Sequence, residues 1–163
     1  MSVTSGKDAR CSIARSLEVL GEKWTLLVVR EACWGRTRFS DFRQALGVAP
    51  DVLADRLATL VEVGVMQRQP YRVEGGRSRE EYVLTPAGED LRLVLGALNT
   101  WGDQHHPAPT GRGSTFVETT TGEPVTLSFV SPDGRTVEPR SVSVVRTLTP
   151  ADRAPSVVGA AVS

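Results

Sequence analysis

The arginines between Trp34 and Arg79 are the side chains of this sequence best suited to bind a polyanion. The stretch holds eight arginines and five acidic residues, a surplus of three positive charges. Arginine is a common source of affinity for double-stranded nucleic acid, whose phosphates carry dense negative charge. Over the whole chain 19 basic and 19 acidic residues cancel, so the net charge does not itself indicate such binding. The prediction therefore depends on whether the fold gathers these arginines on one surface.

Two cysteines and two histidines are the other side chains with reactive or metal-binding chemistry. Cys11 stands at the start of a predicted helix, whose positive end favours the reactive thiolate, and Cys33 stands on a helix that we expect to be buried. Their spacing fits neither a metal site nor a disulfide framework, and His105 and His106 add no further ligand pattern. The sequence shows no carboxylate pair, nucleophile–base set or phosphate-binding loop. We therefore expect no enzyme activity, no cofactor and no metal.

Four helices are predicted in the first part of the chain. Apolar periodicity and glycine stops place the helices at 12–20, 23–33, 41–46 and 50–63. Ser40 is the expected N-cap of the third helix, and Pro50 suits the first turn of the fourth. Three or four residues that include Gly47 join these two helices. A short helix, a tight turn and an amphipathic helix are typical of a helix-turn-helix.

A predicted β-hairpin follows the fourth helix. Residues 65–73 and 82–84 have strand character, and the polar turn between them contains two glycines. Arg77 and Arg79 lie in or beside this turn, so the hairpin has a basic tip. A hairpin directly after a helix-turn-helix predicts a winged helix.

A long apolar helix is expected after the hairpin. Thr85 and Pro86 fit an N-cap and a first-turn proline, and the helix runs to about Asp103. Together with the first helix it presents more apolar surface than one small domain can cover, which predicts a contact between two subunits. The residues assigned to this homodimer contact are Ile13, Leu17, Leu91, Leu95, Leu98 and Trp101.

The fold class that we expect is α+β, a winged helix-turn-helix DNA-binding domain with a long C-terminal dimerisation helix and a small β-rich C-terminal appendage. The expected segments are a winged-helix domain at 1–106, a linker at 107–113, a β appendage at 114–150 and a flexible tail at 151–163. No apolar run approaches the roughly 20 residues of a membrane span, and the N-terminus lacks the features of a secretory signal. We therefore expect a cytoplasmic protein without membrane contact.

Four blocks of the sequence resemble the HxlR-type winged helix-turn-helix regulators, a family related to MarR-type proteins. The blocks are Cys11–Arg30, Arg38–Phe42, Val52–Leu57 and Tyr82–Gly88, in this order. The resemblance spans residues 10–103. It implies a homodimer that binds double-stranded DNA and controls transcription in a prokaryote. It also implies control by an effector, either through oxidant or electrophile sensing at Cys11 with Cys33 as its partner, or through a small molecule bound between the first, second and fifth helices.

The sequence departs from the family pattern at two places. Asp51 follows Pro50 where such proteins usually carry a polar or basic residue. A carboxylate is repelled by phosphate, although it can accept a hydrogen bond from cytosine N4. The C-terminal appendage is similar to an extension of some actinobacterial relatives in which cysteine pairs could bind zinc. This appendage has no cysteine, so no metal is carried over.

The fourth helix is expected to enter the major groove with its N-terminal residues leading. The predicted DNA-contact residues are Arg36, Arg38, Ser40, Pro50, Asp51, Val52, Asp55, Arg56, Arg77 and Arg79. Alternatives remain open, because Arg56 can instead pair with Asp55, with Asp51 or with an acidic residue of another subunit, and Arg38 can pair with Asp41. The alternative function is a winged-helix protein-interaction module without DNA binding, which the neutral net charge and Asp51 favour.

Overall fold

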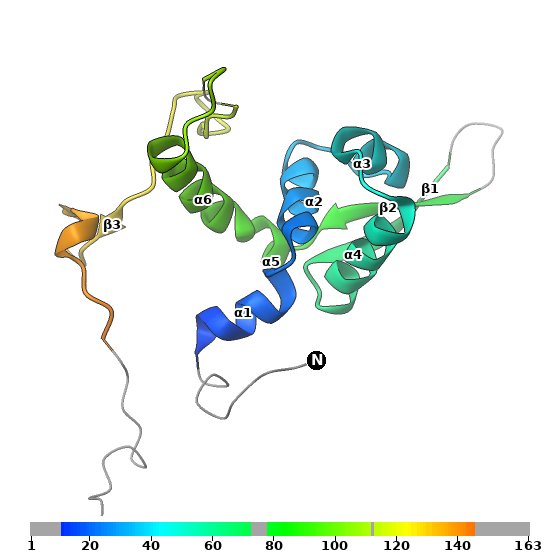
Figure 1. Cartoon of the computed structure of the whole chain (residues 1–163), viewed down its shortest axis with the longest axis horizontal. Coiled ribbons are helices and arrows are strands. Elements are labelled where there is room, and N and C mark those ends of the chain that lie inside the picture. The colour runs from blue at the N-terminus through cyan, green and yellow to red at the C-terminus, as the bar shows by residue number, and fades with distance from the viewer. Residues whose placement is uncertain (1–10, 73–77, 112, 146–163) are drawn as a thin grey trace, which may run out of the picture. The chain divides into compact units, whose positions relative to one another are not determined.

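The computed structural model describes residues 11–72, 78–111 and 113–145, and the chain divides into two compact units with the boundary after Val125 (Figure 1). The described residues of the first unit form six helices and one hairpin. Their bounds are α1 Ser12–Leu20, α2 Lys23–Cys33, α3 Phe39–Leu46, α4 Pro50–Glu62, β1 Met66–Tyr71, β2 Arg79–Leu84, α5 Pro86–Glu89 and α6 Leu91–His105. This order confirms the predicted α+β winged helix. None of the described helices is long and apolar enough to span a bilayer.

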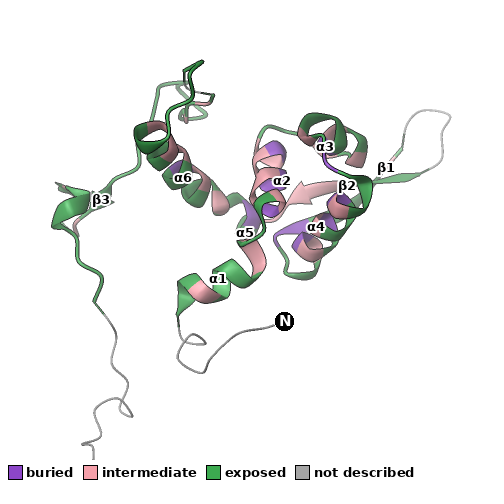
Figure 2. Ribbon diagram, viewed as in Figure 1, coloured by how far each residue is buried: buried purple, intermediate pink, exposed green. Residues whose placement is uncertain are grey.

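The core of the first unit lies between α2, α3, α4 and the start of β1 (Figure 2). Leu53, Leu57 and Leu60 are fully buried on one side of α4, as their spacing along the helix predicts. They meet Val28 and Val29 of α2, which are also fully buried. The remaining buried apolar residues of this core are Phe42, Val48, Val65 and Met66. This packing fixes one face of α4 against the domain.

Three residues form the turn between α3 and α4. Gly47 ends α3 in the left-handed conformation, with φ of 61°, and its amide donates a hydrogen bond to the Arg43 carbonyl. A side chain would be strained at this φ, so glycine suits the position. Pro50 occupies the first turn of α4, as predicted.

Two helix boundaries differ from the sequence-based expectation. The helix α3 begins at Phe39 with Arg38 as N-cap, so Ser40 lies inside the helix and the prediction that it caps α3 was wrong. The Ser40 hydroxyl instead donates to the Asp41 carboxylate at 3.0 Å. The single helix expected after Thr85 is divided at Asp90 into α5 and α6.

The hairpin is antiparallel, with Met66 opposite Leu84 and Tyr71 opposite Arg79. One backbone hydrogen bond attaches it to the loop before α3, where the Tyr82 amide donates to the Thr37 carbonyl at 2.7 Å, and the Thr85 amide closes the base of the hairpin by donating to the Val65 carbonyl at 3.1 Å. The predicted cap at Thr85 is confirmed, since its hydroxyl oxygen accepts from the Gly88 amide. The hairpin root therefore has a fixed position beside the loop before α3.

The first unit continues past α6 through residues 114–125, where Val117 forms an isolated bridge with Pro124. The described part of the second unit contains β3 Phe129–Val130, β4 Thr136–Val137 and the short 3-10 helix η2 Pro139–Ser141. The predicted turn at 131–134 is confirmed, with Gly134 at φ of 84°. A strand expected at 142–145 is not formed. The predicted tail at 151–163 lies outside the described residues.

Candidate nucleic-acid interface

The outer face of α4 is open to solvent. Asp51, Ala54, Asp55 and Ala58 are exposed on this face, while the leucines of the opposite face fill the core (Figure 2). Alanine side chains are short, so a groove wall can approach the helix closely at these positions. The two carboxylates make the face acidic and unsuited to direct contact with phosphate.

Arg56 and Val52 border this face and are half-buried. The alternative in which Arg56 pairs with an aspartate finds no support, because the part of the chain that the structure describes holds no ion pair at Arg56. Its Nε is buried and has no hydrogen-bond partner among the described residues. A buried donor without a partner costs free energy.

Arg38 lies at the N-terminus of α3 and contacts the hairpin. Its guanidinium carbon lies 4.7 Å from the centroid of the Tyr71 ring. The alternative pairing with Asp41 is not seen among the described side chains, and Asp41 accepts from Ser40 instead. The Arg38 side chain is exposed, so it combines a held position with access to solvent.

The arginines of the hairpin itself differ in how far they are available for contact. Arg68 of β1 lies over the Tyr82 ring at 5.7 Å and forms an ion pair of 3.6 Å with Glu80 on the neighbouring strand. Arg79, the first residue of β2, is exposed. Arg77, predicted at the hairpin tip, lies outside the described residues, so its DNA contact stays a prediction.

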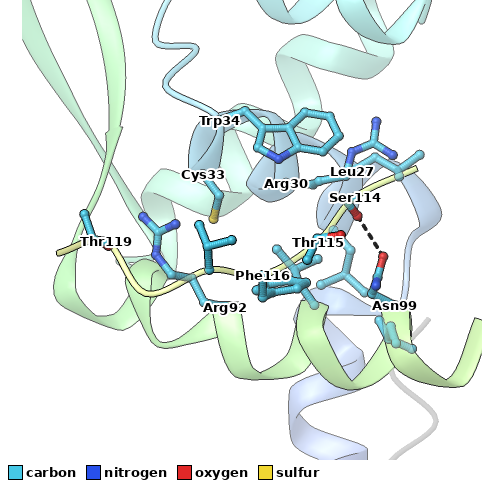
Figure 3. Close-up of a pocket in the computed structure, with 14 residues that line it drawn as sticks. Leu27, Arg30, Cys33, Trp34, Arg92, Asn99, Ser114, Thr115, Phe116 and Thr119 are labelled. Carbon is cyan, nitrogen blue, oxygen red and sulfur yellow. Dashed lines mark hydrogen bonds between the residues drawn. The ribbon is translucent and has the colours of Figure 1, made fainter. Parts of the chain in front are cut away.

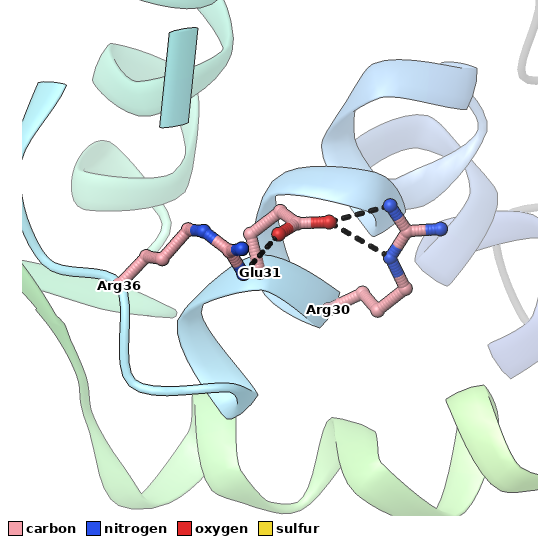
Figure 4. A network of polar contacts seen from close by, with 3 residues as sticks. All are labelled: Arg30, Glu31 and Arg36. Carbon is pink, nitrogen blue, oxygen red and sulfur yellow. Dashed lines mark hydrogen bonds and ion pairs between the residues drawn. The ribbon is translucent and has the colours of Figure 1, made fainter. Parts of the chain in front are cut away.

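Arg36 has a contact that the sequence did not reveal. Its Nη1 forms an ion pair of 2.5 Å with Oε2 of Glu31, a carboxylate with only 2% of its side chain exposed. Arg30 binds the other oxygen, Oε1, also at 2.5 Å (Figure 4). The Arg36 amide additionally donates to the Glu31 carbonyl. Arg36 thus helps hold the loop before α3, and its predicted DNA contact is untested.

Sequence reasoning missed Arg43 and Arg72 as candidates. Arg43 is exposed in the last turn of α3, and Arg72 is exposed just after β1. The signal for Arg43 was available, because Ser40, Arg43 and Gln44 follow helical spacing on the exposed side of α3. Arg43 and Arg72 thus join Arg38 and Arg79 as exposed positive charges on α3 and the hairpin, the elements before and after α4 in the chain.

The HxlR-like helix-turn-helix family matches residues 19–109, more than half of the chain. The chain belongs to this family. The match runs from the end of α1 through the whole of α6, so it includes the helix-turn-helix, the hairpin and the long helix described above.

Relatives of this HxlR-like protein carry names of the same kind. The uncharacterized HTH-type transcriptional regulator Rv3095 of Mycobacterium tuberculosis is 45% identical over 100 residues, which are 61% of this chain and 62% of that protein. The aligned part therefore spans less than two thirds of that relative. The solved structure of PA1607, described as a candidate transcription factor, has a TM-score of 0.74 and 39% identity, covering 88% of this chain and all of that chain. PA1374 from Pseudomonas aeruginosa, described likewise, has a TM-score of 0.59 and 43% identity over 86% of this chain and 94% of that chain.

The six residues predicted for dimerisation fall into an exposed group and a group that packs against the core of this HxlR-like protein. Ile13 and Leu17 of α1 are 70% and 58% exposed, and Leu98 and Trp101 of α6 are 50% and 55% exposed. Leu91 and Leu95 instead pack against the core of the first unit. The role of all six in a homodimer stays a prediction. No residue of α1 is buried, so within the described residues its apolar side has little to cover it.

The two cysteines differ in environment. Cys11 is exposed at the N-cap of α1. Cys33 is half-buried at the end of α2, and this burial raises the pKa of its thiol, although the Arg92 charge opposes the effect. Both thiols are free. A raised pKa reduces the thiolate fraction at neutral pH, which makes Cys33 a poor attacking thiol.

Proposed function

We propose that this chain is a homodimeric transcriptional regulator that binds double-stranded DNA sequence-specifically through α4 and the β1–β2 hairpin. The observation that carries the proposal is the arrangement of α4 and the elements before and after it: the outer face of α4 is solvent-exposed, and Arg38 at the start of α3 is held against Tyr71 at the distal end of the hairpin. Such a helix can lie in a major groove while the flanking elements reach the backbone. The HxlR-like family match supports the same reading.

The charges suggest a division of labour between α4 and its neighbours. The α4 residues Pro50, Asp51, Val52, Asp55 and Arg56 would face the base edges, where a carboxylate can accept from cytosine N4. Phosphate contacts would come from the flanking residues Arg36, Arg38, Ser40, Arg43, Arg77 and Arg79. Contacts to phosphate set position and affinity, while contacts to bases set sequence preference.

A homodimer would present two copies of α4 to one duplex. The exposed apolar side chains of α1 and α6 supply a surface for the contact, since solvent exposure of several large apolar groups is unfavourable. In the DNA-competent form the two α4 helices would lie about one helical turn apart, roughly 34 Å. An effector that prefers another spacing would shift the dimer away from this form.

Control by a small molecule is the effector mode that the described residues favour. The raised pKa of Cys33 disfavours it as the resolving partner of Cys11 in an oxidation switch. Oxidant or electrophile sensing by Cys11 alone is a separate mode of control, and a Cys11→Ser variant would lose this response. In both modes the protein would act on DNA in the cytoplasm of a prokaryote.

The test is fluorescence anisotropy with labelled duplexes tiled across the region upstream of the protein's own gene. We expect one duplex to bind much more tightly than the others, with affinity falling steeply as salt rises. Ala54→Glu would block the approach of α4 and abolish the preference. The matched control is Ala108→Glu, which alters an exposed alanine outside the hairpin and α4.

The rival function, a protein-interaction module without DNA binding, is favoured by Asp51 and Asp55 on the exposed face of α4. It predicts no binding to any duplex even at low salt. That result would overturn the proposal.

A further inference from the structure

Glu31 is the only buried acidic residue in the part of the chain that the structure describes, with 2% of its side chain exposed. A buried carboxylate loses its hydration, so it needs partners that neutralise it and satisfy its oxygens. Arg30 donates to Oε1 from Nε at 3.1 Å and from Nη2 at 2.5 Å. Nη1 of Arg36 forms an ion pair of 2.5 Å with Oε2 (Figure 4). Each carboxylate oxygen is therefore engaged by a different arginine.

The two arginines lie on opposite sides of this carboxylate (Figure 4). Arg30 lines a cavity of about 480 Å³ between α2, α6 and residues 114–119, where its guanidinium carbon lies 4.9 Å from the centroid of the Trp34 ring (Figure 3). Arg36 lies in the loop before α3, and 39% of its side chain is exposed. Among the described contacts its guanidinium is engaged through Nη1 alone. Its Nε and Nη2 therefore keep N–H groups for an external acceptor.

The loop that carries Arg36 is also held through its backbone. The Arg36 amide donates to the Glu31 carbonyl at 3.2 Å, so Glu31 contacts this residue with both its main chain and its side chain. The next residue, Thr37, accepts a hydrogen bond from the Tyr82 amide of β2 at 2.7 Å. The position of one buried carboxylate is therefore linked to the Arg36 guanidinium and, through Thr37, to the hairpin.

We propose that Glu31 is a positioning residue for DNA binding, which acts by holding Arg36 so that its remaining N–H groups meet a phosphate. This inference rests on the proposed function. A guanidinium already held in one geometry loses less side-chain freedom when it binds, so its orientation raises affinity. Arginine suits this task because its planar group has five donors and can bind a carboxylate and a phosphate along different edges.

The charge of Glu31 by itself predicts the opposite effect. A carboxylate near DNA repels phosphates, so a chain without it would bind any duplex more tightly. Loss of positioning would instead weaken the binding, because Arg36 would then have to be ordered by the DNA. The direction of the change in Glu31→Gln therefore distinguishes the two roles.

The experiment is fluorescence anisotropy of the full chain on its preferred duplex over a range of salt concentrations. We expect Glu31→Gln to weaken binding at least about fivefold. It should also lower the slope of log affinity against log salt by about one, as Arg36→Gln does. The double variant Glu31→Gln/Arg36→Gln should bind no more weakly than Arg36→Gln, because Glu31 acts through that side chain. Tighter or unchanged binding of Glu31→Gln, or additive losses in the double variant, would overturn the inference.

The matched control is Arg30→Gln, which removes the other partner of the same carboxylate and leaves the pair of Arg36 with Glu31 intact. It should lower the stability of the fold and keep the salt slope unchanged, with affinity within about twofold. A loss of affinity as large as that of Glu31→Gln would trace the effect to the fold and overturn the inference. If Glu31→Gln does not fold, Glu31→Asp keeps the charge with a shorter reach. It should show both losses to a smaller degree, and unaltered binding would have the same overturning force.

Hydrogen exchange of the DNA-free chain separates this inference from the proposed function. In Glu31→Gln the Tyr82 amide should exchange at least about tenfold faster relative to the Leu57 amide in the core helix α4, whose exchange reports global unfolding. If the unchanged chain binds no duplex, the proposed function is refuted, and the exchange ratio still decides whether Glu31 holds the loop and the hairpin. An unchanged ratio would show that it does not.

Discussion

The guanidinium of Arg38 lies over the ring of Tyr71, 4.7 Å from its centroid, and so joins the start of α3 to the hairpin. The contact holds an exposed positive charge at the start of α3, the first helix of the helix-turn-helix, where we propose that it meets a phosphate of bound DNA. We predict that Arg38→Gln weakens binding to all duplexes and lowers the slope of log affinity against log salt by about one.

Tyr71→Leu should act in the same direction and less strongly, because an exposed cation–π contact contributes about 0.5–1 kcal/mol. Anisotropy titrations over a range of salt concentrations measure both effects, with Arg140→Gln as the control. An unchanged salt slope in Arg38→Gln would contradict a phosphate contact at this residue.

Asp51 places a carboxylate in the first turn of α4 on its exposed face. We predict that Asp51→Asn strengthens binding to unrelated duplexes by about 1 kcal/mol, because it removes repulsion from nearby phosphates. Its effect on the preferred duplex should be smaller or opposite, so the ratio of specific to non-specific affinity falls. Glu138→Gln, an exposed acid of the second unit, is the matched control. Equal gains for both kinds of duplex would show that Asp51 reads no base.

The elements of the first unit could be predicted because their signals are local. Apolar spacing along α2 and α4 and the Thr85 cap depend only on nearby residues, and these predictions were confirmed. The start of α3 was misplaced because the helix uses no side-chain cap at Arg38. The sequence rule that assigns serine to the cap then selected Ser40 instead.

The contacts that join distant segments could not be predicted. Arg38 with Tyr71 and Asn99 with Ser114 are contacts between residues far apart in the chain, and no local pattern marks them. Glu31 stands between apolar and basic neighbours, so its sequence context suggests an exposed helix position. Its burial follows from the packing of α2, which leaves two arginines to neutralise one hidden carboxylate. The cavity was likewise invisible, because one wall comes from a segment after α6.

Leu17 of α1 is 58% exposed, and α1 has no buried residue. We predict that Leu17→Asn raises the dimer dissociation constant at least about tenfold, because two copies of an apolar contact are lost. Sedimentation velocity across a concentration series measures this change. Val144→Asn, at a residue 99% exposed in the second unit, is the control and should leave the association unchanged. Unaltered sedimentation of the Leu17 variant would remove α1 from the subunit contact.

Gly88 lies where backbone and side chain leave no space for a methyl group. A Cβ at this position would come within 2.2 Å of the Val65 carbonyl oxygen and 2.9 Å of a Leu84 methyl carbon. We predict that Gly88→Ala lowers the free energy of unfolding by about 1–3 kcal/mol, the usual cost of overpacking. Gly102→Ala in α6 meets nothing within 4 Å and should raise helix stability by up to about 1 kcal/mol. Urea unfolding of both variants tests the pair, and the opposite order would refute the close approach.

Cys33 supplies a prediction about pH. Burial raises the pKa of its thiol in the folded chain, so between the unfolded and folded pKa values the unfolded chain holds fewer protons. Stability from this group is therefore complete below the ordinary cysteine pKa of about 8.5 and is lost as pH rises through the folded pKa. We expect iodoacetamide to modify Cys33 more slowly than the exposed Cys11 at pH 7, with the rate at Cys33 climbing steeply at alkaline pH.

Mass spectrometry of peptides from timed samples resolves the two cysteines. In urea the difference should disappear, because unfolding exposes both thiols equally. The decline in stability above about pH 8.5 should be reduced in Cys33→Ala, which has no thiol to titrate at this position. Rapid modification of folded Cys33 at neutral pH would show that its thiolate is readily available. It would then be a competent resolving thiol for Cys11, and an oxidation switch would regain its place beside small-molecule control.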